Sequence, residues 1–234
     1  MNTALKCFFL IFTIAFYQPL VKAQSDKKTP DFSRFNAKVS VAIPTIIANR
    51  SFKNIFKGIY ELELNLQCRL VKGFYLGIHG NYAGFKLDDQ ISNIANSECR
   101  ISSSGFNVGF EKFSSPRILW YFNLGGGQNW FNYYKLPCAD SVTAIISEKG
   151  LNVKPSLGFT YYSDDNFSIG MIASYTYLAH TFNPGNQCLQ SFAKFKEADS
   201  KKSTQYFSIG ILLNFNLRKA LFQDNFESDG VEDN

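Results

Sequence analysis

The sequence has 234 residues and a formal net charge of +5, and charged residues make up 18% of it. That share is below the roughly 25% of a typical soluble domain, whereas the aromatic share of 16% is high. The net charge is too small to indicate a nucleic-acid-binding protein, since such a protein neutralises many phosphates. A mean hydropathy of −0.13 argues against a bundle of membrane-spanning helices but is compatible with a transmembrane β-barrel, whose inner face is polar.

The N-terminus predicts a secretory signal peptide over residues 1–23. Lys6 supplies the positive charge, residues 7–17 form an apolar stretch, and Val21-Lys22-Ala23 ends in the small residue that a signal peptidase requires. A membrane anchor is the alternative, but the apolar stretch is shorter than the ~20 residues of a spanning helix. We expect cleavage after Ala23, which leaves residues 24–34 as a periplasmic N-terminal segment.

The run Ile59–Leu70 alternates strictly between apolar and polar side chains. Its even-numbered positions are Tyr60, Leu62, Leu64, Leu66, Cys68 and Leu70, and its odd-numbered positions include Glu61, Glu63, Asn65, Gln67 and Arg69. Successive side chains of a strand point to opposite faces, so this run predicts a strand with one oily and one charged face. Its length suits an oblique membrane crossing, which takes about 9–11 residues.

The same alternation recurs along the chain and predicts eight strands. In chain order they cover residues 35–46, 59–70, 74–85, 105–113, 118–130, 151–162, 167–177 and 204–217. The apolar residues that define these faces, such as Phe106, Val108 and Phe110 in the fourth run, have no Asp, Glu, Lys or Arg between them on the same face, as contact with hydrocarbon requires. We therefore predict an eight-stranded antiparallel up-and-down transmembrane β-barrel over residues 35–217. Alternation places Gln128 beside Trp130 on the oily face, so we expect a bulge at Gly125–Gly127 that resets the faces.

The predicted connections alternate in length. Short turns join the second and third, fourth and fifth, and sixth and seventh strands, while longer segments at residues 47–57, 86–104, 132–150 and 179–203 join the others. Bacterial outer-membrane barrels have short periplasmic turns and long external loops. Both chain ends are then expected in the periplasm, where the acidic residues 218–234 form a disordered tail.

Aromatic side chains lie near both ends of the oily faces, as in the belts that mark membrane interfaces. Aromatic packing between two sheets of a sandwich is the alternative. The aromatic residues toward the long loops are Tyr60, Tyr82, Trp130, Tyr175, Tyr177 and Phe207, and those toward the short turns are Phe74, Trp120, Tyr161, Phe167 and Phe215.

The opposite face carries three acids and three bases among amides and a histidine. An eight-stranded barrel has room inside only for its own side chains or one small ligand, and buried charges persist when paired. We predict a plug of paired groups; a proton relay at Glu61 and Glu63 is the alternative. The polar face comprises Lys38, Glu61, Glu63, Arg69, Glu111, Lys154, His79, Asn65, Gln67, Asn81, Asn107, Asn152, Asn214 and Asn216.

Four cysteines remain after the signal peptide. Cys68 lies on the oily face as a small apolar residue. Cys99, Cys138 and Cys188 fall in three predicted external loops, where one pair could form a disulfide. A three-cysteine metal site is the sharper alternative, but the spacings match no zinc module, so we expect no metal.

Catalytic motifs are absent from the sequence: there is no Gly-x-Ser-x-Gly, His-Glu-x-x-His or Walker loop. His180, expected at the start of a loop beside Thr181, is the one candidate base for a lipid-modifying enzyme; a solvated loop histidine is the plainer interpretation. We expect no enzyme, no catalytic residues and no cofactor.

The last strand, Ser208–Phe215, resembles the C-terminal signal by which the barrel-assembly machinery recognises its clients. With Lys154-Pro155-Ser156-Leu157-Gly158 and Tyr161-Tyr162, the chain resembles the small outer-membrane β-barrel family of Bacteroidota described as PorT-like. The resemblance implies an outer-membrane location and, for some members, a link to type IX secretion.

Our leading hypothesis is therefore a non-enzymatic integral outer-membrane barrel with a plugged lumen and external loops that contact a partner or ligand. The expected partners are outer-membrane lipid, the assembly machinery and a secretion-system or surface partner. The alternatives are a lipid- or lipopolysaccharide-modifying enzyme and a soluble periplasmic, lipocalin-like binder of a hydrophobic ligand, with the oily faces turned inward.

Overall fold

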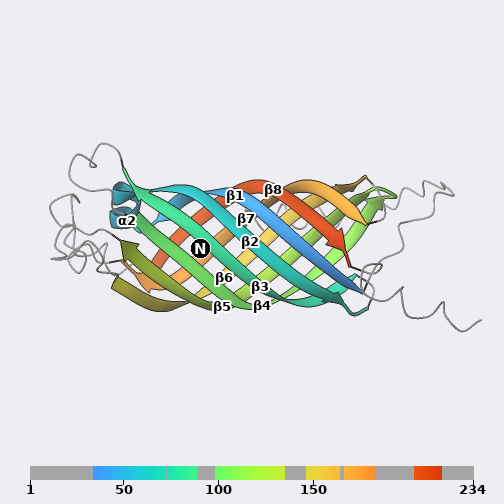
Figure 1. Ribbon diagram of the computed structural model, residues 1–234, viewed down its shortest axis with the longest axis horizontal. Helices are drawn as coiled ribbons and strands as arrows, with labels where there is room; N and C mark the ends of the chain where they lie inside the picture. The colour runs from blue at the N-terminus through green and yellow to red at the C-terminus, as the bar shows by residue number, and fades with distance from the viewer. Residues whose placement is uncertain are drawn as a thin grey trace, which may run out of the picture.

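The protein forms a closed antiparallel barrel of eight strands, each paired with its sequence neighbours and β8 with β1. The computed structural model describes residues 34–71, 73–88, 98–134, 146–163, 166–182 and 203–217. The strands tilt strongly against the long axis of the barrel (Figure 1). They are β1 Phe35–Ala48, β2 Phe56–Arg69, β3 Phe74–Leu87, β4 Glu98–Ser115, β5 Ile118–Tyr134, β6 Ile146–Tyr162, β7 Phe167–Thr181 and β8 Ser203–Asn216.

The predicted barrel, its strand number and its strand order are thus confirmed. The predicted signal peptide over residues 1–23, nearly all of the segment 24–34 and the predicted tail 218–234 lie outside the described residues.

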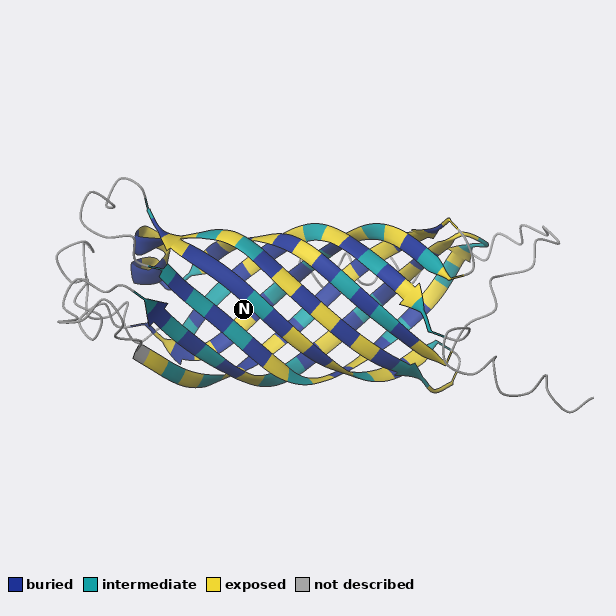
Figure 2. Cartoon of the chain, in the orientation of Figure 1, coloured by how far each residue is buried: buried dark blue, intermediate teal, exposed yellow. Residues whose placement is uncertain are grey.

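The two faces of the strands differ sharply in burial, and Figure 2 shows this as a chequered pattern along each strand. On β2, Leu62 and Leu64 are 45% and 48% exposed, whereas Glu61 and Glu63 are 2% and 3% exposed. The apolar face therefore points outward and the charged face inward, as predicted. A lipocalin-like arrangement needs the opposite orientation and is excluded for these residues.

One end of the barrel carries the short turns together with the start of β1 and the end of β8 (Figure 1). Leu217 N donates to Phe35 O at 3.0 Å, which ties the two terminal strands together there. In the turn between β2 and β3, Phe74 N donates to Val71 O at 2.9 Å. Gly73 takes a φ of 89°, a conformation that glycine adopts readily.

The opposite end departs from the prediction, because the strands run further and the connections are shorter than expected. β4 begins at Glu98 rather than Gly105, β5 ends at Tyr134, and β6 begins at Ile146. On β4 and β5 the inward side chains become apolar toward this end, as at Ile101 and Phe131, so the contrast between faces that marks a membrane strand fades there.

A short helix, α2 (Arg50–Ile55), lies at this end, within a connection that we predicted as a long loop. Asn49 caps it: its side chain accepts from Phe52 N at 3.2 Å, and its φ is 67°, which Asn tolerates better than most residues. Phe52 and Ile55 are fully buried, so the helix turns its apolar side into the barrel mouth. No helix in the described part of the chain is long and apolar enough to cross a membrane.

The predicted bulge at Gly125–Gly127 is wrong. The pairing of β5 with β4 and with β6 runs through these glycines without a register shift. Gln128 does face outward, two residues before Trp130 on the same face. The tryptophan belongs to the predicted interfacial belt, so the amide lies near the polar interface and needs no bulge to turn it inward. Register shifts occur instead near strand ends, as between Gly58 and Tyr60.

Candidate functional site

The outer surface is divided along the barrel axis into an apolar band and a polar rim. On β3 the outward residues from the short turn are Phe74, Leu76 and Ile78, then Tyr82, and finally the exposed Lys86. The aromatic rings near the ends of the band pair across strands, with centroids 6.1 Å apart for Tyr60–Tyr82, 5.3 Å for Trp120–Phe159 and 5.2 Å for Phe167–Phe215. Large apolar side chains exposed all around a barrel, bounded by aromatic residues, are the features of a lipid-facing surface.

Inside the barrel, the end near the short turns holds two bases around one acid. Glu111 pairs with both Lys38 and Arg69, and we call these three residues the turn-end triad. The Lys38 ammonium also lies 4.3 Å from the ring centroid of Tyr121 and 4.9 Å from that of Tyr75, which suits a desolvated cation.

Two glycines make room for these tyrosine rings in the narrow lumen. A Cβ on Gly109 would lie 2.2 Å from the Tyr75 hydroxyl oxygen, and one on Gly158 would lie 2.4 Å from the Tyr121 ring. Each tyrosine ring therefore occupies the space that a side chain at the facing glycine would fill. The lumen is filled by large residues opposite small ones, as in other small barrels.

Further along the lumen, two acids surround one base. Lys154 Nζ lies 2.8 Å from Glu61 Oε1 and 2.5 Å from Glu63 Oε2, and we call these residues the central triad. Asn81 Nδ2 donates to Glu61 and Asn65 Nδ2 donates to Glu63, both at 2.8 Å. Each carboxylate therefore has a charged and a neutral donor.

The two triads carry opposite net charges, because the first has two bases and one acid and the second two acids and one base. They are stacked in one lumen and together are electrically neutral. All three acids and all three bases of the prediction are thus paired, which is the condition under which buried charges persist. The prediction of a paired plug is confirmed for these residues.

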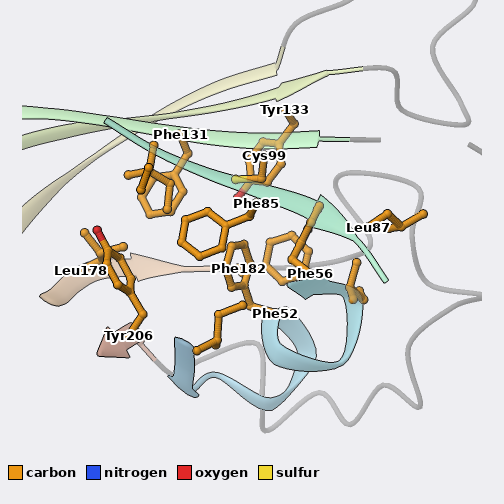
Figure 3. Close-up of a cluster of buried hydrophobic side chains, with 14 residues drawn as sticks. Phe52, Phe56, Phe85, Leu87, Cys99, Phe131, Tyr133, Leu178, Phe182 and Tyr206 are labelled. Atoms are coloured by element: carbon orange, nitrogen blue, oxygen red, sulfur yellow. The ribbon is translucent and has the colours of Figure 1, made fainter. Parts of the chain in front are cut away.

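Beyond the polar lumen, the α2 end of the barrel is filled by a cluster of apolar side chains, which we call the aromatic cap (Figure 3). Phe52 of α2 lies at its centre, with ring centroids 5.0 Å from Phe56, 5.4 Å from Phe85 and 5.2 Å from Phe182. The cap comprises Ile46, Phe52, Ile55, Phe56, Ala83, Phe85, Leu87, Cys99, Ile101, Phe131, Tyr133, Leu178, Phe182 and Tyr206.

The sequence analysis missed this cap, although a signal for it exists. On β3 the inward positions change from His79 and Asn81 to Ala83, Phe85 and Leu87 without a break in the alternation. The odd-numbered residues of β3 thus continue to point inward, while they change from polar to apolar side chains. The lumen is therefore closed twice, by ion pairs at the level of the apolar band and by packed rings toward α2.

His180 is not the loop residue that we predicted. It lies in β7, faces inward and is 9% exposed. Its Nε2 lies 2.8 Å from Glu148 Oε2 and 3.5 Å from the hydroxyl oxygen of Tyr133, and its ring contacts Phe131 in a tilted arrangement with centroids 4.0 Å apart. The hydroxyl group of Tyr133 is itself fully buried. His180 therefore lines the aromatic cap inside the barrel and does not face the outer surface.

Cys99 was also predicted in an external loop, but it lies in β4, fully buried in the aromatic cap, with a free thiol. It therefore contributes no external disulfide. Cys68 is also free and lies partly exposed on the outer face, as predicted. Cys138 and Cys188 lie outside the described residues. Among the residues that the structure describes, no group of three or more His, Cys, Asp or Glu could hold a metal ion.

Comparison with known proteins finds matches in structure only. No family model and no curated protein sequence matches the chain. Neisserial surface protein A superposes with a TM-score of 0.52 at 10% identity, over 80% of this chain and 99% of that one. A major outer-membrane protein of Thermus thermophilus gives 0.48 at 12% identity over 77% and 99%, and Ail of Yersinia pestis gives 0.42 at 14% over 79% and 100%. The chain has the fold of a small outer-membrane β-barrel protein.

Proposed function

We propose that the protein is an integral outer-membrane β-barrel with a closed lumen that acts through its external surface rather than as a pore or an enzyme. The observation that carries this proposal is the double closure of the barrel, by the two charge triads and by the aromatic cap. Within the described residues, a closed barrel leaves its outer band and its two ends for contact with other molecules.

The membrane placement is supported by the uninterrupted apolar band and is tested by fractionation. The protein should stay with membranes in alkaline carbonate and be released by detergent. Release by carbonate alone would contradict the placement.

The closed lumen is tested by single-channel recording in planar bilayers. We expect no steady conductance from the wild-type protein. A control variant with Lys154→Ala, Glu61→Ala and Glu63→Ala opens the level of the central triad only, so the turn-end triad and the aromatic cap should keep it closed. Current should pass only when Lys38→Ala, Arg69→Ala and Glu111→Ala open the turn-end triad as well and Phe52→Ala and Phe56→Ala open the cap. Steady conductance of the wild-type protein would refute the closed lumen.

The absence of enzymatic activity is supported by the burial of His180, the only candidate base that the sequence offered. The contact of Nε2 with Glu148 Oε2 at 2.8 Å and the ring contact with Phe131 hold its imidazole against the barrel wall. The lipid A profile of cells with His180→Gln should equal that of wild-type cells. A changed profile, with the protein at the wild-type level, would favour a lipid-modifying enzyme instead.

For the external partner we propose a cell-surface or secretion component, with type IX secretion suggested by the resemblance to PorT-like proteins. Co-purification of the full chain from detergent-solubilised membranes tests this. Recovery of type IX components would support the link, and their absence under conditions that retain a known type IX complex would count against it.

A further inference from the structure

The hydrogen-bonded pairing between β6 and β7 is incomplete near α2. β6 begins at Ile146 and β7 ends at Thr181, but the first register pair of the two strands is Asn152 with Leu178. Beyond that pair, the end of β6 pairs with β5 and the end of β7 pairs with β8. We call the unpaired stretch between residues 146–151 and 179–181 the β6–β7 seam.

The pairing between β1 and β2 stops early as well. β1 runs to Ala48 and β2 begins at Phe56, yet their register pairs end at Ala42 and Glu61. Beyond them, β1 pairs with β8 and β2 with β3. The α2 end of the sheet is therefore divided into two panels, one of three strands (β7, β8 and β1) and one of five strands (β2 to β6), and α2 connects them.

A proline lies near each interruption. The pairing of β6 with β7 passes over Pro155 and resumes at Ser156 with Ser174. In β1, Pro44 lies two residues beyond the last pair with β2. Proline has no amide hydrogen to donate, which weakens a sheet at its position. The interruptions therefore have a local cause in the sequence.

The two interruptions are held together in different ways. Between β1 and β2, a Cβ on Gly58 would lie 2.0 Å from Pro44 O, so the two backbones are in contact there. At the β6–β7 seam, side chains make the contact: His180 Nε2 lies 2.8 Å from Glu148 Oε2, and the His180 ring contacts Phe131. The β1–β2 side can therefore act as a hinge, and His180 as a latch on the seam.

Two side-chain amides without partners lie at the foot of the seam. Asn152 forms the first pair with β7, and Asn129 pairs in register with Gly150, two residues away. Asn129 is 0% and Asn152 3% exposed, yet neither the nitrogen nor the oxygen of either amide has a hydrogen-bond partner among the described residues. A buried polar group without a partner destabilises the closed arrangement. Water that enters an opened seam can bond to both amides, which offsets part of the cost of opening.

From these observations we propose that the α2 end of the barrel opens sideways at the β6–β7 seam, with the β1–β2 side as the hinge and His180 with Glu148 as the latch. Opening separates the two panels that share the aromatic cap, because Leu178 belongs to one panel and Phe131 to the other (Figure 3). The central triad joins β2 and β6 within the five-strand panel, so it stays intact. The inference goes beyond the proposed function, because it adds an open state of the cap to a lumen that stays closed at the level of the triads.

The experiment is a pulsed electron-spin distance measurement on the full chain in nanodiscs, with the native cysteines replaced. Labels at Lys149→Cys and Thr181→Cys face outward on either side of the seam. The matched control is the pair Lys149→Cys and Asn132→Cys, which lies within the five-strand panel. We expect a short and a long distance across the seam and a single distance for the control pair. A single distance across the seam, both with His180 present and with it removed, would overturn the proposal.

Loss of the latch should shift the balance toward the open state. His180→Ala removes the contacts of the imidazole with Glu148 and Phe131. The ratio of the long to the short distance should therefore rise by about fivefold, which corresponds to the loss of one hydrogen bond of ordinary strength. The control pair should stay unchanged. An unchanged ratio across the seam in His180→Ala would overturn the proposal.

A cross-link tests the opening without spin labels. A Cβ on Gly150 would lie 3.5 Å from His180 Cβ, a separation that suits a disulfide, so Gly150→Cys with His180→Cys should lock the seam on oxidation. Oxidation should slow amide hydrogen exchange at residues 146–151 and 178–181 relative to the reduced form of the same variant, and should leave residues 102–104 of β4 unchanged. Equal exchange at the seam in the two forms would overturn the proposal.

Discussion

On β3, the residues nearest the short turns and the residues nearest α2 use the two faces of the strand in opposite ways. Near the turn, Leu76 and Ile78 point outward and His79 points inward; near α2, Lys86 points outward while Phe85 lies inside. The backbone alternation is the same in both regions. Under the proposed membrane placement, the difference lies in which solvent surrounds the barrel.

The comparison teaches that one closed sheet combines two kinds of barrel. At the level of the apolar band the interior is polar and held by ion pairs, as in a membrane barrel. Toward α2 the interior is an aromatic core and the exterior is polar, as in a soluble barrel. The tyrosines Tyr60 and Tyr82 lie where the two arrangements meet. The larger apolar core therefore lies toward α2, whereas the band level holds only the small cluster of Tyr121, Ile172 and Leu212 beside its ion pairs.

The largest effect is expected from Glu111→Ala in the membrane-level region. It leaves Lys38 and Arg69 without their acid, and removing one partner of a buried pair costs about 3–5 kcal/mol. Unfolding of the refolded protein by denaturant measures it. The control is Glu98→Gln, whose pair with Arg100 is exposed and contributes about 1 kcal/mol or less. Equal effects of the two substitutions would contradict the buried triad.

Phe52→Ala tests the other region. Phe52 is fully buried at the centre of the aromatic cap, and truncation of a buried Phe costs about 3–5 kcal/mol. Because α2 lies at the rim, we expect the loss to be local. Amide hydrogen exchange should quicken in α2 and the adjoining strand ends while β2 near Glu63 stays protected. Uniform acceleration along β2 would show that the two regions are one cooperative unit.

Leu64→Arg and Gln205→Arg compare the two outer surfaces. An arginine facing lipid near the middle of the bilayer costs about 2–4 kcal/mol, whereas one near the interface costs about 0–1 kcal/mol. Leu64 lies within the apolar band and Gln205 on the polar rim. Folding free energies measured in lipid vesicles should therefore differ by about 2 kcal/mol or more. Similar values would mean that both positions contact the same medium.

A smaller effect is expected at Asn49, which positions α2 over the barrel mouth. Asn49→Ala removes the cap to Phe52 N and places alanine, which adopts positive φ less readily than asparagine, at a φ of 67°, and loss of a cap costs about 0.5–2 kcal/mol. Asn49→Gly tolerates the φ and loses only the side-chain hydrogen bonds, so it should destabilise less. Thermal unfolding compares the two. A glycine variant less stable than the alanine variant would contradict the role of the backbone angle.

The sequence predicted the membrane-level region well because two requirements coincide there. On β2, lipid demands Leu62, Leu64 and Leu66 on one face, and a narrow lumen demands pairable groups such as Glu61 and Glu63 on the other. The alternation of apolar and polar residues and the positions of the charges therefore both predicted the same outward and inward faces. The equal number of acids and bases predicted that these groups pair. Which base meets which acid depends on the strand register, which the sequence alone did not supply.

The external end could not be predicted in the same way. On β4, Cys99 and Ile101 are buried inside and Arg100 points outward, so the two faces have exchanged their chemical character. The pattern of a membrane strand ends there, and we took the strand end for a loop. Cys99 and His180 were misplaced for this reason. α2 is six residues long, too short for helical periodicity to stand out, and only the spacing of Asn49, Phe52 and Ile55 hinted at a capped turn.

The central claim, that the outer surface passes from lipid to water along each strand, is tested most directly by nitroxide accessibility on β6. Leu157→Cys, Val153→Cys and Lys149→Cys, each in a variant lacking the native cysteines and reconstituted in vesicles, place a label on every second outward position. Relaxation by oxygen should exceed that by a nickel chelate at positions 157 and 153, and the order should reverse at 149. Greater access to the nickel chelate at all three positions would contradict the account.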